Sequence, residues 1–96
     1  MRDLCKVIEN IIDIMNNAQI EHTDKEAAEE LKNDLHSVFD SAKFAAPEMI
    51  RFHWHEGQEY INDFVHFVSH AYEGPIPPWA WEILETWTGK QLHGNT

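Results

Sequence analysis

The sequence is poor in cysteine and glycine, and it has no long hydrophobic run. A single cysteine excludes a disulfide within the chain, which is typical of proteins from a reducing compartment. Four glycines leave little room for a glycine-rich phosphate loop. No apolar run approaches the roughly 18–20 residues that span a membrane, and Lys6, Glu9 and Asp13 interrupt the N-terminal segment where a secretory signal needs an unbroken one. We therefore expect a cytoplasmic protein with no membrane association.

Positive charge is also scarce. The 96 residues include seven lysines and arginines against seventeen aspartates and glutamates, which gives a formal net charge of −10. Nucleic-acid binding depends on basic side chains that neutralise phosphates, so direct binding of DNA or RNA is not expected. An acidic surface attracts and steers basic protein partners, although it can also serve solubility alone.

Apolar residues recur at spacings of three and four, the period of a helix, and no stretch alternates as a strand would. The apolar positions of the first two such segments are Leu4, Ile8, Ile11, Met15 and Ala18, and then Ala28, Leu31, Leu35, Val38 and Ala42. Asp3 is placed to cap the first helix, and Thr23 with Glu26 has the spacing of a capping box for the second. Two helices of similar length joined by a short turn predict an antiparallel pair.

The second half of the chain predicts a third long helical region and a short last helix. Pro47 suits the first turn of a helix. Met49 and Phe52 point away from the face set by the apolar residues of positions 61–68, which favours a break or kink near Gly57, with one helix from 47 to about 55 and another from 58 to 73. Pro78 can open the last helix and Gly89 can end it. Residues 91–96 are expected to form a loose tail.

These patterns predict one all-α domain over residues 1–96. We expect a small bundle of four to five helices, built from an antiparallel N-terminal pair, a third long helix and a short C-terminal helix. Three long amphipathic helices in so short a chain can leave apolar surface exposed, so a homodimer is compatible with the pattern.

The polar face of the 58–73 segment carries acidic and histidine side chains at spacings of four and three. They are Glu59, Asp63, His66, His70 and Glu73. On one helix this spacing places them in a narrow strip, where His66, His70 and Asp63 could bind a divalent metal ion. The solvent-facing side of an ordinary amphipathic helix would contain the same residues, and neither an H-E-x-x-H motif nor a paired Glu-x-x-His repeat is present.

No arrangement typical of an enzyme is found. His53 and His55 would point in different directions on a helix, and no serine or cysteine lies beside them to act as a nucleophile. Cys5 lies at the fringe of an apolar face and is expected to be a small, half-buried residue rather than a reactive thiolate. We expect no enzymatic activity and no cofactor.

Trp81 falls outside the apolar face of the last helix, beside Glu82 and Glu85. An aromatic side chain with acidic neighbours suits contact with a basic, partly apolar surface. Alternatively, Trp81 folds back over the proline-rich connector of residues 75–78.

Charge, size and the lack of a catalytic motif together predict a non-enzymatic acidic binding protein. Its expected partner is a basic surface of a nucleic-acid-processing enzyme or a toxin, which it would inhibit by presenting carboxylates where phosphates would lie, as a DNA mimic, an immunity protein or a phage-encoded inhibitor does. The residues expected to bind this partner are Glu59, Asp63, His66, His70, Glu73, Trp81, Glu82 and Glu85. The alternative is a small metal-binding protein that uses His66, His70 and Asp63.

Overall fold

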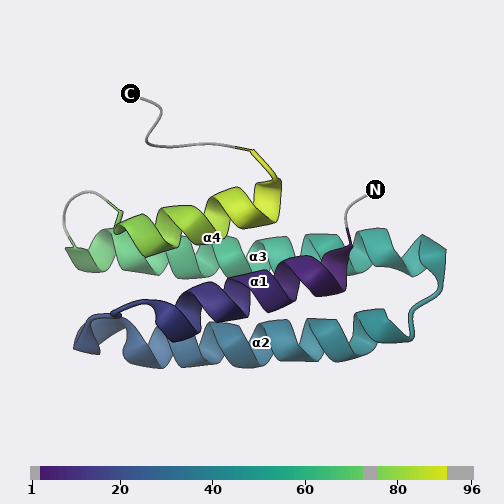
Figure 1. The fold of residues 1–96 in the computed structure, drawn as a ribbon, viewed down its shortest axis with the longest axis horizontal. Helices are drawn as coiled ribbons and strands as arrows, with labels where there is room; N and C mark the ends of the chain where they lie inside the picture. Colours follow the sequence, from purple (N-terminus) through teal and green to yellow (C-terminus); the bar gives the residue numbers. More distant parts are fainter. Residues whose placement is uncertain (1–2, 73–75, 91–96) are drawn as a thin grey trace.

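The described residues form four α-helices in an up-and-down bundle (Figure 1). The structure is a computed structural model that describes residues 3–72 and 76–90, with the side chains of 70–72 left out. The helices are α1 (Leu4–Asn17), α2 (Lys25–Lys43), α3 (Pro47–Tyr72) and α4 (Pro78–Thr88), and a short 3₁₀ turn, η1 (His22–Asp24), precedes α2. Each helix runs antiparallel to the one before it, which confirms the predicted all-α bundle and its N-terminal pair.

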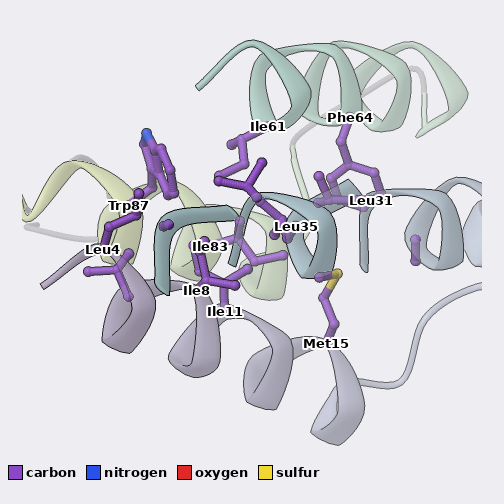
Figure 2. Close-up of a cluster of buried hydrophobic side chains, with 14 of the residues drawn as sticks. Leu4, Ile8, Ile11, Met15, Leu31, Leu35, Ile61, Phe64, Ile83 and Trp87 are labelled. Carbon is purple, nitrogen blue, oxygen red and sulfur yellow. The ribbon is translucent and has the colours of Figure 1, made fainter. Parts of the chain in front are cut away.

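The core lies where all four helices meet. Helix α2 packs against both α1 and α3, and α4 packs chiefly on α1 and also on α3. Four side chains, one from each helix, are completely buried at this centre: Ile8, Leu35, Ile61 and Ile83 (Figure 2). Burying each of them stabilises the fold by about 1.5–3 kcal/mol relative to exposure. The apolar faces predicted from the helical period are therefore the faces that are buried.

Most of the predicted helix ends are confirmed. The Asp3 carboxylate accepts hydrogen bonds from the backbone N–H groups of Cys5 at 3.0 Å and Lys6 at 3.4 Å, so it caps α1. Pro78 opens α4, and Gly89 follows it with a φ of 73°, in the left-handed region that a side chain would disfavour.

The predicted capping box at Thr23 is wrong. Thr23 lies inside η1 and α2 begins at Lys25, directly after Asp24. Asp24 is fully buried, and neither of its carboxylate oxygens has a hydrogen-bond partner among the described residues. Such burial is costly, although the partial positive charge at the start of α2 offsets part of this cost for a carboxylate. The 3₁₀ turn occupies the position of the expected cap. This turn contacts α3 as well as α2, and the spacing of residues in the sequence does not reveal such a tertiary contact.

The predicted break near Gly57 is also wrong, because α3 is one continuous helix from Pro47 to Tyr72. A Cβ placed on Gly57 would lie 2.5 Å from Cη2 of the Trp87 ring. The glycine therefore lets α4 approach α3 closely and does not interrupt the helix. Met49 and Phe52 do point away from the core, as their phase predicts, and they remain exposed on the intact helix.

Apolar surface remains exposed around the α2–α3 connection and farther along α3. The large hydrophobic side chains concerned are Phe44 at 87%, Phe52 at 55%, Met49 at 46% and Phe67 at 46% exposure. Within the parts of the chain that the structure describes, no helix combines the length and apolar character required to cross a membrane. The predicted tail, residues 91–96, lies outside the described residues.

Candidate functional site

The polar strip of α3 is exposed, as its spacing predicts. Glu59, Asp63 and His66 all lie on the solvent side of the helix. Glu59 contacts a histidine of the preceding turn, with 3.2 Å between its Oε1 and Nε2 of His55. The His70 side chain and Glu73, which would extend the strip, lie outside the described residues.

No set of three histidine, cysteine or acidic side chains that could hold a metal ion occurs among the side chains described. The predicted set of His66, His70 and Asp63 includes the His70 side chain, which lies outside the described residues. The metal-binding alternative therefore stays a prediction.

The two histidines that flank Trp54 diverge. His53 is half-buried, with its Nδ1 3.2 Å from Oε1 of Glu56, whereas His55 is exposed. Cys5 is half-buried, as predicted, and its thiol donates to the Phe39 carbonyl oxygen at 3.9 Å. Burial raises the pKa of the Cys5 thiol, and the charges of Asp3 and Glu9 raise it further while Lys43 opposes them. A raised thiol pKa lowers the thiolate fraction and hence the reactivity.

The acidic residues of α4 lie beside α1. Glu82 and Glu85 line an open hollow between α1 and α4, together with Val7, Asn10 and the basic residue Lys90. Trp81 is half-buried, and Glu82 beside it is exposed. Of the residues predicted as one partner-binding set, Glu59, Asp63 and His66 thus lie on the exposed side of α3, whereas Glu82 and Glu85 line this hollow.

A second hollow, between α2 and α3, was not predicted. This α2–α3 groove has a volume of about 420 Å³, within the range of pockets that bind ligands. From η1 and α2 it is lined by Thr23, Glu26, Ala27, Glu30, Leu31 and Asp34, and from α3 by Tyr60, Asp63, Phe64 and Phe67. Its deepest side chains, Leu31 and Phe64, are 3% and 4% exposed, while Phe67 is 46% exposed. The groove therefore combines an apolar, partly aromatic floor with a rim of carboxylates.

The electrostatic field of the α2–α3 groove is negative. None of the described residues that line it is a lysine or arginine. Ion pairs do form elsewhere on α2, where Lys32 Nζ lies 2.9 Å from Glu29 Oε1 and Lys43 Nζ lies 4.0 Å from Asp40 Oδ1. Burial raises the pKa of the Tyr60 phenol, and the negative charges of Glu56, Asp34 and Glu59 raise it further.

The row of carboxylates on this rim could have been recognised from the sequence. Glu26, Glu30 and Asp34 follow one another at a spacing of four, which puts them in one row along α2. What the spacing alone does not give is the register that sets this row opposite Tyr60 and Phe67.

Comparison of the chain with protein-family models, with curated proteins and with solved structures found no match.

Proposed function

We propose that this chain is a non-enzymatic binding protein whose acidic surface occupies a basic surface of a partner protein. The observation that carries the proposal is the continuous run without positive charge: no lysine or arginine occurs from Phe52 to Gly89. Within that run Glu59 and Asp63 are exposed on α3, and Glu82 is exposed on α4. A surface of one sign attracts an opposite one and accelerates association with it.

The partner that best fits this surface is a protein whose basic groove handles nucleic acid. Carboxylates can lie where phosphates would bind in such a groove, so the chain would act as an inhibitor of the immunity-protein or phage-inhibitor type. The 26 residues of α3 extend about 39 Å, at a rise of about 1.5 Å per residue, and Glu59 and Asp63 lie one turn apart on its exposed side.

Affinity capture from an extract of the source cells, with mass spectrometry to identify the captured protein, tests this proposal. The wild-type chain is compared with Glu59→Lys/Glu82→Lys, which reverses one exposed charge on each of α3 and α4. We expect a protein with a basic groove to be captured by the wild type and at least about tenfold less of it by the variant, since reversed charges repel the partner.

The matched control is Glu9→Lys/Asp13→Lys, which makes the same change in net charge on the exposed side of α1. It should capture nearly as much partner as the wild type. Equal loss in both variants would show that net charge alone governs capture, and stoichiometric metal that disappears in a His66→Ala/His70→Ala variant would favour the metal-binding alternative. Either result would contradict the proposal.

A further inference from the structure

The α2–α3 groove combines an exposed aromatic side chain with a row of carboxylates. Phe67 is 46% exposed in a molecule whose other α3 core side chains, Ile61, Phe64 and Val68, are at most 4% exposed. Tyr60 lies one α3 turn before Phe64 and is half-buried at the same groove. Such a floor leaves apolar surface for a ligand to cover.

The carboxylates on the rim of the groove favour a positively charged ligand. Glu26 and Glu30 are exposed and Asp34 is half-buried, and no ion pair or hydrogen bond engages the three side chains within the described part of the chain. Asp63 adds a fourth carboxylate from α3. Four negative groups around an aromatic floor fit a cationic ligand, because each carboxylate can accept a charge-assisted hydrogen bond and the faces of aromatic rings attract cations.

Arginine fits this combination better than lysine does. Its planar guanidinium can stack on a ring while its N–H groups donate to carboxylates at the edge, whereas an ammonium is a compact and strongly hydrated charge. We propose that the α2–α3 groove binds arginine side chains of a basic protein segment, with guanidinium groups stacked on Phe67 or Tyr60 and paired with Glu26, Glu30 or Asp34. This inference rests on the proposed function, since it names the part of the basic partner that enters the groove.

The spacing of the rim suggests how such a segment lies. Carboxylates four residues apart on a helix are about 6 Å apart along its axis. Alternate side chains of an extended peptide are about 6.5–7 Å apart on one face. A segment with arginine at every second position would therefore match the row of Glu26, Glu30 and Asp34 as it runs along the groove.

Isothermal titration of the full chain with the peptide acetyl-Arg-Ala-Arg-Ala-Arg-amide, and with the same peptide containing lysine, tests the inference. We expect one peptide per chain and binding about two- to fivefold tighter for the arginine peptide, the contribution of one exposed cation–aromatic contact. Backbone amide NMR shifts should change at Glu30, Tyr60 and Phe67 and not at Glu82.

Two pairs of variants locate the site. Glu26→Gln/Glu30→Gln should weaken binding about fivefold, while Glu9→Gln/Asp13→Asn, with the same change of net charge on α1, should weaken it less than about twofold. Phe67→Ala should abolish the preference for arginine, and Phe52→Ala, which truncates another exposed phenylalanine of α3, should retain it.

Equal affinity for the two peptides, or equal weakening by the α1 and α2 variants, would overturn the inference and leave only diffuse electrostatic attraction.

Partner capture distinguishes a failure of the groove assignment from a failure of the proposed function. If Glu59→Lys/Glu82→Lys loses the partner and Glu26→Gln/Glu30→Gln retains it fully, the groove assignment fails while the proposed function stands. If the arginine peptide binds in the groove but no basic partner is captured, the proposed function fails and the groove assignment stands.

Discussion

Trp87→Ala is expected to lower the free energy of unfolding by about 3–5 kcal/mol, the usual result of truncating a buried tryptophan. Trp87 is 3% exposed and its ring meets Trp54 edge-on, with 4.8 Å between the ring centroids. Its Nε1 donates a hydrogen bond of 2.7 Å to Oε1 of Gln58. Alanine would leave a cavity between α3 and α4 and remove the donor for Gln58.

Urea unfolding followed by circular dichroism measures this loss. Trp87→Phe serves as the matched variant, because it keeps an aromatic ring in the cavity and removes the hydrogen bond and part of the volume. Its loss should be about 1–2 kcal/mol, smaller than that of the alanine variant. A loss below about 1 kcal/mol for Trp87→Ala would mean that α4 contributes little to the fold, contrary to the packing described above.

Gly57→Ala is expected to destabilise the fold by about 1–2 kcal/mol even though alanine is the better helix former. Within a helix the substitution alone would stabilise by roughly 0.5–1 kcal/mol. The added methyl group, however, would lie 2.5 Å from Cη2 and 3.0 Å from Cζ2 of Trp87. The Trp87 ring cannot easily move aside, because Trp54 and Gln58 hold it, so overpacking by about 1–3 kcal/mol outweighs the helical gain.

A double-mutant cycle tests the cause of this effect. In a Trp87→Leu background the space beside Gly57 opens, and Gly57→Ala should then be neutral or stabilising by up to about 1 kcal/mol. The sign of the Gly57→Ala effect should therefore reverse between the two backgrounds. If the substitution destabilises both backgrounds equally, the glycine serves a purpose other than close contact with Trp87.

Gly57 also illustrates what the sequence could not reveal. A glycine inside a helical pattern indicates either a local interruption or a close approach by another element, and residues near it in sequence do not distinguish these cases. The element that approaches is Trp87, 30 positions later, and its contact exists only once α4 folds back on α3. The faces of α1 and α2 were predictable because their apolar residues keep the helical period without interruption and bury one continuous stripe.

Of the candidate sites, one follows from a single helix and the other depends on the packing of two helices. The exposed strip of Glu59, Asp63 and His66 follows from the phase of a single helix, so it could be predicted from spacing. The α2–α3 groove depends on which residues of two antiparallel helices face each other. Glu30 and Tyr60 are separated by thirty positions, and only the register of α2 against α3 brings both to one groove.

We propose that this chain binds its partner through opposite charges. The most direct test is the dissociation constant of the complex with the captured partner, measured by titration at 50 mM and at 500 mM sodium chloride. We expect the dissociation constant to rise at least about tenfold with salt, because the screening length falls from roughly 14 Å to about 4 Å over this range. A dissociation constant that stays constant between the two salt concentrations would contradict it.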